Sequence, residues 1–510
     1  MASTWGGKGC IIAIDQSTQA TKAVLFDRAG RPARRVTLPH RQIYPAAGFV
    51  EHDPLEILAN AKAAALDLVR ESGVPPSSIA ALSITNQRET VLAWDSATGK
   101  PVHNALVWQD GRGAGLCERL AAEGLGPTVK ARTGLRLDPY FSASKLAWIA
   151  RESGAARSAL AAGRLMAGTV DAWLIWNLTG GEVFATDYSN ASRTMLFDIR
   201  KLEWDRELLG AFGIEGIRLP EPRCSDADFG IAEIEGLGAA LPIAGVMGDS
   251  HAALFGHCGW RPGDAKATYG TGSSIMSNIG RQPADPGEGL VLSLAWGREG
   301  RAEYVFEGNI HSTGYTMRWL RDNLGLFSDY AEAELEAVEA GGNGGVYLVP
   351  AFSGLGAPYW EHGISAIVTG LSHGSDRRHL IRAGLESIAF QVRDLVEEMD
   401  ARSGAPLAQL HVDGGPTRNA FLMQFQADLL GIPVTVPEVE ELSALGAAYM
   451  GGMARGLWAG PEEVAALPVA ARKYLPRMEA REREALVAAW KSAVAQAMSR
   501  KIDTSARSGS

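Results

Sequence analysis

The sequence predicts an α/β protein made of two related domains with a cleft between them. The chain has 510 residues, more than one domain usually holds. Its opening stretch, 11–27, has the pattern of a strand, a polar turn and a second strand, and this pattern recurs at 265–280. We therefore expect a first domain over residues 1–256 and a second over 257–500. We expect the polar tail, 501–510, to be disordered.

Composition argues against several classes of protein. A hydrophobic share of 46% allows a sizeable core, while a net charge of -9 argues against a nucleic-acid or anionic-membrane surface. The four cysteines stand far apart without a CxxC pair, so we expect neither a disulfide framework nor a zinc site. No apolar run approaches the ~18 residues of a membrane span, and we find no secretion signal. We therefore expect a cytoplasmic protein.

The first half of the chain alternates short apolar strands with helices. Ile11–Ile14 is a β-branched run that suits a buried strand, and it ends on Asp15. Pro54 suits the first turn of an amphipathic helix that continues to Glu71. The other expected elements are strands at 34–40, 79–85, 91–94, 105–108 and 241–247, helices at 160–167, 170–178 and 250–255, and a polar loop at 186–194.

The second half begins with the repeated pattern at 265–280. A strand at 410–412 then leads into the turn Gly414-Gly415-Pro416. We expect helices at 377–400, 419–430, 443–455 and 479–498.

Three polar turns, each following an expected strand, are candidate phosphate sites. They are Ser17–Lys22, Gly270–Ser274 and Gly414–Asn419. Backbone N–H groups and hydroxyls in such turns cradle phosphate oxygens, and three turns together favour a nucleotide. The chain lacks both G-x-x-x-x-G-K-S/T and a G-x-G-x-x-G that opens a βαβ unit, which argues against a P-loop protein and a dinucleotide fold.

Two carboxylates end apolar strands, and phosphoryl transfer to a hydroxyl group needs such carboxylates. Asp15 suits a Mg²⁺ ligand, and Asp249 suits the base that accepts the hydroxyl proton. The alternative for Asp249 is a plain N-cap of the helix that follows it.

A polar pair and two aromatic residues are candidates for a small polar ligand. Arg88 and Glu89 could donate to and accept from the two hydroxyls of a diol. The alternative is an ordinary surface ion pair. Trp108 and Tyr140 could wall the ligand, although most aromatic residues belong to the core.

A different class of function also fits one stretch. Gly248-Asp249-Ser250-His251-Ala252 resembles the nucleophile elbow of a serine esterase, with Ser250 as nucleophile. This alternative needs a separate histidine, for which His311, His362 and His373 are available, and it leaves the three polar turns unexplained.

Long motifs along the chain resemble the FGGY carbohydrate kinase family, most of all its glycerol kinase branch. The resemblance spans about 11–473. Its motifs are DQSTQATKAV at 15–24, FVEHDP at 49–54, SITNQRET at 83–90, LDPYFSASK at 137–145, GTVDAWLIWNLTGG at 168–181, TDYSNASRTMLFDI at 186–199, GDSHAALFGH at 248–257, KATYGTG at 266–272, GLGAPYW at 354–360, VDGG at 412–415, NAFLMQFQADLLG at 419–431 and ALGAAYMGG at 444–452.

The resemblance implies a fold, a reaction and a set of residue roles. It implies two ribonuclease-H-like domains of the actin and hexokinase type, and phosphate transfer from ATP, with Mg²⁺, to a polyol or sugar. Asp249 matches the family's catalytic base and Asp15 the acid near Mg²⁺. The matched nucleotide positions are Thr18, Lys22, Thr271, Gly314, Gly415 and Asn419, and the matched polyol positions are Arg88, Glu89, Trp108 and Tyr140. Family members are often dimers or tetramers.

Two departures from the glycerol kinase pattern bear on the substrate. Ser250 stands where glycerol kinases carry Gln, and Ser274 stands where they carry Phe. Both changes remove bulk, so we expect an acceptor of four or five carbons, such as a polyol or a ketopentose (xylulose or ribulose). Glycerol stays an alternative because the other polyol positions match. A nucleotide-binding protein without catalysis is a further alternative, which the Arg88-Glu89 pair disfavours.

Overall fold

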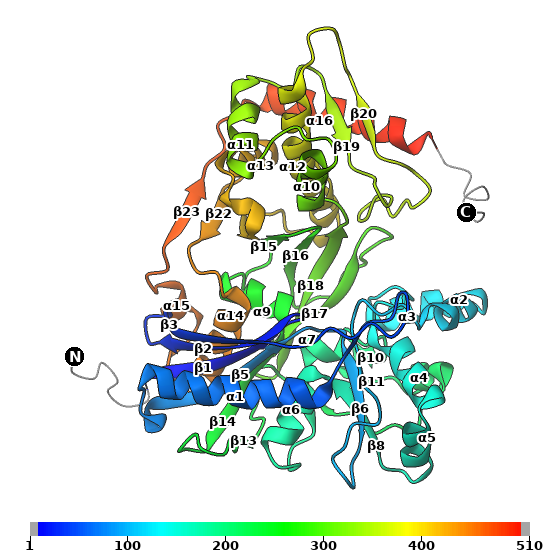
Figure 1. The fold of residues 1–510 in the computed structure, drawn as a ribbon, viewed down its shortest axis with the longest axis vertical. Helices are drawn as coiled ribbons and strands as arrows, with labels where there is room; N and C mark the ends of the chain where they lie inside the picture. The colour runs from blue at the N-terminus through cyan, green and yellow to red at the C-terminus, as the bar shows by residue number, and fades with distance from the viewer. Residues whose placement is uncertain (1–8, 501–510) are drawn as a thin grey trace.

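The computed structural model describes residues 9–500, and these form two lobes, each built around a mixed β-sheet (Figure 1). The sheet of the first lobe has six strands in the order β13-β14-β5-β1-β2-β3. These strands are β1 (Cys10–Gln16), β2 (Ala20–Asp27), β3 (Pro32–Pro39), β5 (Ile79–Asn86), β13 (Ile231–Ala232) and β14 (Leu241–Gly248).

The sheet of the second lobe has seven strands in the order β17-β18-β16-β15-β21-β22-β23. They are β15 (Asp264–Tyr269), β16 (Ser273–Gly280), β17 (Val291–Arg298), β18 (Arg301–Ile310), β21 (Gln409–Gly414), β22 (Val434–Pro437) and β23 (Ala471–Tyr474).

The two sheets share one pairing pattern at their centres. β1 pairs antiparallel with β2 and parallel with β5. In the second lobe, β15 likewise pairs antiparallel with β16 and parallel with β21. The repeat that the sequence predicts is therefore present in the backbone, with the β1–β2 hairpin and the β15–β16 hairpin in equivalent places.

Smaller sheets and the helices complete the lobes. A four-stranded sheet contains β4 (Glu51–His52), β7 (Ala105–Leu106), β6 (Val91–Asp95) and β8 (Leu165–Thr169), and three strand pairs are β9 (Ala185–Asp187) with β12 (Glu221–Arg223), β10 (Phe197–Asp198) with β11 (Glu203–Trp204), and β19 (Tyr347–Val349) with β20 (Ile367–Thr369). The helices are α1 (Pro54–Ser72), α2 (Ala114–Ala122), α3 (Gly126–Thr133), α4 (Ser142–Glu152), α5 (Gly154–Ala161), α6 (Val170–Leu178), α7 (Tyr188–Ala191), α8 (Arg206–Phe212), α9 (Asp249–Gly256), α10 (Gly314–Asp322), α11 (Tyr330–Glu339), α12 (Arg377–Ser403), α13 (Ala420–Leu430), α14 (Leu442–Ala454), α15 (Pro461–Ala465) and α16 (Ala480–Met498), with short 3₁₀ turns at η1 (Pro76–Ser78) and η2 (Gly415–Arg418).

Local sequence explains where the main helices begin and end. In α1, the Asp53 side chain accepts a hydrogen bond from the Leu55 N–H, Pro54 occupies the first turn, and Gly73 ends the helix with a φ of 63°. In α12, Asp376 and His379 form a capping box. β1 and β5 are buried along their whole length, as central strands covered on both faces are.

Helix α14 comes late in the chain but packs on the first lobe. Its residue Leu445 shares a hydrophobic core with Ile11 of β1. Glycines let the backbones approach closely: a Cβ at Gly446 would lie 1.7 Å from the carbonyl oxygen of Ala252. The core of the first lobe thus includes residues from both halves of the sequence, and a division into domains at residue 256 stays a prediction.

One predicted helix is wrong, and one predicted loop contains regular structure. The expected helix at 160–167 is instead the end of α5 followed by the buried strand β8. Gly163, with a φ of 66°, turns the chain between them, and Leu165–Thr169 is buried throughout, which favours a strand. The expected loop at 186–194 contains β9 and the short helix α7. The predicted disordered tail, 501–510, lies outside the described residues.

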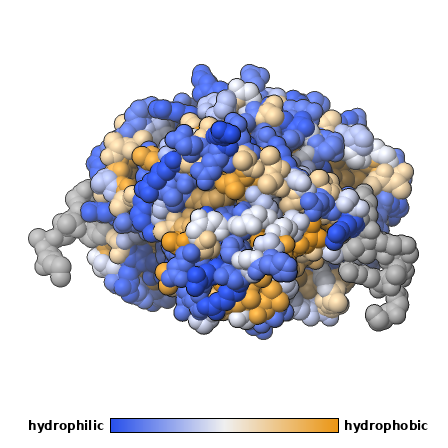
Figure 2. Space-filling view, turned by 90° about the horizontal axis from the view of Figure 1, so that it is seen from above, coloured by the Kyte–Doolittle hydropathy of each residue, from blue (hydrophilic) through white to orange (hydrophobic). Residues whose placement is uncertain are grey.

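The surface at the end of the molecule seen from above in Figure 2 carries hydrophobic residues in separate patches among hydrophilic ones. Leu335 and Val338 of α11 are among the exposed hydrophobic residues of the second lobe. No helix within residues 9–500 is long and apolar enough to cross a membrane.

Candidate active site

Two cavities meet at the carboxyl end of β14, and a third adjoins the larger of the two. We call them the central cavity, of about 770 Å³, the glycine cavity, of about 590 Å³, and the carboxylate cavity, of about 210 Å³. Asp249, Ser250 and Thr268 line both the central and the carboxylate cavity, and Gly270 lines both the central and the glycine cavity. The three cavities are therefore neighbours, and Asp249 lies where the central and carboxylate cavities meet.

Asp249 is the first residue of α9, and Gly248 occupies the N-cap position. Asp249 therefore lies one residue past the N-cap position, although its side chain still accepts a hydrogen bond from the Ser250 N–H in the first turn. Its side chain is 35% exposed, and its Oδ1 lies 3.4 Å from Nε of Arg88. Burial raises the pKa of Asp249, with Arg88 opposing the rise and Glu89 adding to it. A carboxylate of raised pKa beside a cavity suits the role of a base.

Four buried charges form a network behind Asp249. Arg88 donates through both terminal nitrogens to Glu307, at 2.9 and 2.8 Å, and Arg193 donates to Glu89 at 2.7 Å. Burial alone would raise the pKa of Glu307, but the guanidinium groups of Arg193 and Arg88 outweigh it and hold that pKa well below its usual range. Arg88 and Glu89 are thus a fixed, buried pair, and the surface-pair alternative is wrong.

Aromatic side chains wall the other side of the central cavity. The rings of Trp108 and Tyr140 meet edge to face, with centroids 5.6 Å apart. The indole N–H of Trp108 donates to Oγ1 of Thr18 at 2.9 Å. All three residues line the central cavity.

The two serines that depart from the glycerol kinase pattern also line the central cavity. The Ser274 hydroxyl donates to Glu307 at 3.2 Å. The Ser250 N–H donates to Asp249 at 2.6 Å, and no hydrogen bond joins the Ser250 hydroxyl to a histidine within residues 9–500. The triad that an esterase needs is therefore not assembled around Ser250.

The carboxylate cavity gathers charged groups from both lobes. Asp15 and Lys22 come from the β1–β2 hairpin, Lys266 from β15, Asp413 from β21, and Glu441 precedes α14. Lys22 donates to Glu441 at 3.0 Å, and its Nζ lies 3.9 Å from Asp15.

The electrostatics of the carboxylate cavity favour an added cation. Burial raises the pKa of Asp15 to about 7, Lys22 opposes this, and Asp249 and Glu441 add to it. No group of three or more His, Cys, Asp or Glu residues between 9 and 500 converges as a complete metal site. A Mg²⁺ ion, however, is commonly held by one or two carboxylates together with water and substrate phosphates, and this cavity fits that pattern.

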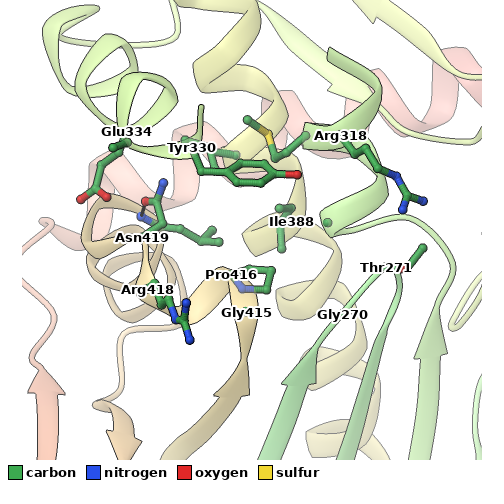
Figure 3. Close-up of a pocket in the computed structure, with 15 residues that line it drawn as sticks. Gly270, Thr271, Arg318, Tyr330, Glu334, Ile388, Gly415, Pro416, Arg418 and Asn419 are labelled. Carbon is green, nitrogen blue, oxygen red and sulfur yellow. Dashed lines mark hydrogen bonds between the residues drawn. The ribbon is translucent and has the colours of Figure 1, made fainter. Parts of the chain in front are cut away.

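The glycine cavity brings together four predicted nucleotide residues, Thr271, Gly314, Gly415 and Asn419 (Figure 3). A Cβ at Gly314 would lie 2.5 Å from the carbonyl oxygen of Gly270, so the backbone segments touch directly. The remaining walls are largely apolar and include Met317, Tyr330, Leu385, Ile388, Pro416 and Leu422. In Figure 3 the Tyr330 ring lies above Ile388 and Pro416, and such a slot suits a flat heteroaromatic ring.

The structure separates two residues that the sequence predicts to act together. Thr18 and Lys22 both belong to the β1–β2 hairpin, and the family resemblance predicts phosphate contacts for both. Thr18 faces the central cavity beside Trp108, whereas Lys22 faces the carboxylate cavity. Their nucleotide contacts stay predictions.

Several residues of the site lie outside the sequence-based predictions. Glu307 follows the apolar run 304–306 and Lys266 lies between two alanines, and a charge next to buried apolar residues is a signal that points to a buried, paired charge. Arg193 stands in a polar stretch with no distinguishing pattern. Tyr330 and Met317 come from helices whose sequences carry no sign of a ligand.

Comparisons with known proteins agree with this geometry. Residues 10–256 match the model of the N-terminal domain of the FGGY family of carbohydrate kinases, and residues 265–455 match that of its C-terminal domain. The chain is 49% identical to a glycerol kinase of Symbiobacterium thermophilum, over 96% of this chain and 98% of that protein. It is 50% identical to glycerol kinase 1 of Thermotoga maritima, over 95% and 98%.

A solved structure extends the similarity to the fold. The glycerol kinase of Plasmodium falciparum, determined with ADP, superposes with a TM-score of 0.91 at 32% identity, covering 97% of this chain and 99% of that one.

Proposed function

The chain belongs to the FGGY family of carbohydrate kinases and is an ATP-dependent phosphotransferase that acts on an alcohol group, and we propose that its preferred acceptor is a polyol or ketose of four or five carbons. The main support for this acceptor length is that Ser250 and Ser274 both face the central cavity beside Asp249. Neither serine can fill the space of a glutamine or a phenylalanine. The space beyond Arg88 and Glu89 therefore accommodates further substrate carbons.

In the proposed reaction, a terminal hydroxyl of the acceptor lies beside Asp249. Arg88 and Glu89 bind the neighbouring hydroxyls, and Trp108 and Tyr140 pack against the carbon chain. Asp249 accepts the hydroxyl proton as the oxygen attacks the γ-phosphorus of ATP, and ADP leaves. Because Arg88 is fixed by its buried bonds to Glu307 and lies 3.4 Å from Asp249, little reorganisation is needed at this step.

We assign the nucleotide to the glycine cavity and its phosphates to the space between Gly270 and the carboxylate cavity. The adenine would lie against the apolar wall with Tyr330, and Gly415 and Asn419 would contact it from η2 and the start of α13. Asp15 would hold Mg²⁺, which when bound neutralises charge on the phosphates. Lys22 and Lys266 would balance the remaining carboxylates.

Glycerol is the second candidate acceptor, because the relatives at 49% and 50% identity are named glycerol kinases. The pair Arg88-Glu89, with Trp108 and Tyr140, would suit glycerol as well as a longer polyol. A homo-oligomeric state and a cytoplasmic location stay predictions.

The test is ADP release by the purified protein with ATP and Mg²⁺ across a panel of acceptors. The panel contains glycerol, erythritol, threitol, the pentitols, xylulose, ribulose and a blank without acceptor. We expect a four- or five-carbon compound to exceed glycerol in kcat/KM by tenfold or more, which is about 1.4 kcal/mol of transition-state binding. A highest kcat/KM for glycerol would overturn the proposed preference and identify glycerol as the acceptor.

A further inference from the structure

Strand β18 presents a row of polar side chains to the central cavity. Glu307, Asn309 and His311 alternate along the chain, with His311 directly after the end of the strand, and all three line the cavity. Residues two apart share one face of a strand. The intervening Gly308 faces the other way, because a Cβ there would lie 2.5 Å from Leu395 of α12. The row begins at Glu307, beside Arg88, and leads away from it.

The two outer members of this row have unused hydrogen-bonding groups. Glu307 is fully engaged by Arg88, Arg193 and Ser274. Within residues 9–500, by contrast, neither the side-chain amide of Asn309 nor the imidazole nitrogens of His311 make a hydrogen bond. Polar groups that line a cavity without internal partners are available to a polar ligand.

The loop that follows β19 holds His311 in place. The Ala357 N–H donates to the carbonyl oxygen of Asn309 at 3.0 Å. A Cβ at Gly356 would lie 3.0 Å from the His311 ring, so the loop backbone packs directly against the imidazole. The rings of His362 and Trp360 lie 6.1 and 6.2 Å from the His311 ring, measured between centroids. His311 is therefore positioned by packing, as recognition of a ligand requires.

The chemistry of this end of the cavity favours neutral hydroxyl or carbonyl groups. Burial, and then His362, lowers the pKa of His311, so its ring is neutral at pH 7 and has one donor and one acceptor. Asp138 lines the same cavity and disfavours an anionic ligand. The nearby cation, Arg136, already stacks on Trp360 at 4.4 Å and pairs with Glu288.

We propose that Asn309 and His311 form a distal subsite that hydrogen-bonds the hydroxyl or carbonyl groups of a neutral acceptor beyond its third carbon. This inference rests on the proposed function, since it adds a recognition element to the same cavity. Opposite residues of paired strands lie about 4.5–5.5 Å apart, and Asn309 is paired directly with Ser274. The subsite therefore begins where the missing bulk at Ser274 opens the cavity.

The test compares His311→Phe with wild type on the same acceptor panel, using kcat and KM for each acceptor and KM for ATP. Phe keeps a ring for the Gly356 loop but removes both hydrogen-bonding nitrogens. We expect the ratio of kcat/KM for the best four- or five-carbon acceptor over that for glycerol to fall at least tenfold, through a higher acceptor KM. Asn309→Leu should lower the same ratio, and it serves as the second variant if His311→Phe melts far below wild type.

The matched control is His373→Phe, an exposed histidine outside the cavity, which should leave the ratio as in wild type. An unchanged ratio in both His311→Phe and Asn309→Leu would overturn the subsite, whatever acceptor the wild type prefers. A change confined to KM for ATP would also overturn it, because the residues would then serve the nucleotide. A preference of the wild type for glycerol, in contrast, would overturn the proposed function alone.

Discussion

The β1–β2 hairpin and the β15–β16 hairpin have the same strand pairing but different chemistry at their tips. The first ends on the charged pair Asp15 and Lys22, which faces the carboxylate cavity. The second ends on 270–272, Gly-Thr-Gly, which offers backbone and a hydroxyl but no charge. The repeated backbone thus decides where each tip lies, and the residues at the tip decide whether it supplies charge or close backbone contact.

The largest effect is expected from Asp249, because it lies in the cavities that both hairpins border. Asp249→Asn should lower kcat by about 10²–10⁴, the usual contribution of a general base, with ATP affinity nearly unchanged. ADP release and calorimetric titration with ATP measure the two quantities. Asp67→Asn, an exposed carboxylate on α1, is the control. If Asp249→Asn keeps wild-type kcat, the base is another group.

The second-largest loss of activity is expected from a substitution at the charged tip of the β1–β2 hairpin. Asp15→Asn should lower kcat by about 10–100-fold and raise the Mg²⁺ concentration needed for half-maximal rate, since a metal contact is lost. Rates measured across a Mg²⁺ series test this. A normal Mg²⁺ dependence in the variant would show that the first hairpin supplies no metal contact.

The same substitution should stabilise the protein without ligands. The folded-state pKa of Asp15, about 7, lies above its ordinary value of 3.8, so its contribution to stability is fully present below pH 3.8 and is lost as pH rises from there through 7. An asparagine at this position does not ionise, so the free energy of unfolding of the variant does not fall in this way as pH rises. The melting temperature of Asp15→Asn should therefore exceed that of wild type by more at pH 8 than at pH 5.5. Equal differences at the two pH values would contradict the raised pKa.

At the uncharged tip, an added side chain should lower the stability of the fold through a steric clash. A Cβ at Gly272 would lie 2.3 Å from the carbonyl oxygen of Ile310, so Gly272→Ala should destabilise the fold by about 1–3 kcal/mol. Denaturant unfolding measures this free energy. Gly115→Ala, where no heavy atom lies within 4 Å of the new carbon, should not be destabilised. Equal stability of the two variants would mean that the second tip tolerates a side chain.

The smallest effect concerns the strand behind the second tip. Ser274→Phe should refill the central cavity and lower the ratio of kcat/KM for four- or five-carbon acceptors over glycerol by about tenfold. Kinetics on the acceptor panel provide the measurement. If the ratio holds, side chains other than Ser274 set the length of acceptor that fits.

Local pattern predicted most of the fold and the centre of the site. The expected strands around Asp15, Asp249 and Thr271 are present, and the family resemblance and the two-domain α/β fold are confirmed by the comparisons. The strand predictions succeeded because each depends on neighbouring residues: a short apolar run, followed by a polar turn. The error at 160–167 arose where Gly163 divides an apolar stretch between a helix and a strand.

Contacts between residues that are far apart in the sequence cannot be predicted from local sequence pattern. Glu307 meets Arg88, 219 residues away in sequence, and nothing near either residue specifies the other. The apolar wall around Tyr330 likewise forms only when α10, α11, α12 and α13 come together. The roles of the individual site residues stay predictions until the variants above are measured.

The packing of α14 on the first lobe has a consequence for protein synthesis. The ribosome makes β1 and β5 early, but Leu445 and its neighbours, which complete the core around Ile11, emerge only after about nine-tenths of the chain. We therefore expect folding of the first lobe during translation to pause at an unfinished core, with apolar surface open to chaperones or to aggregation. A fragment that stops at residue 256 should for the same reason be a poor independent domain.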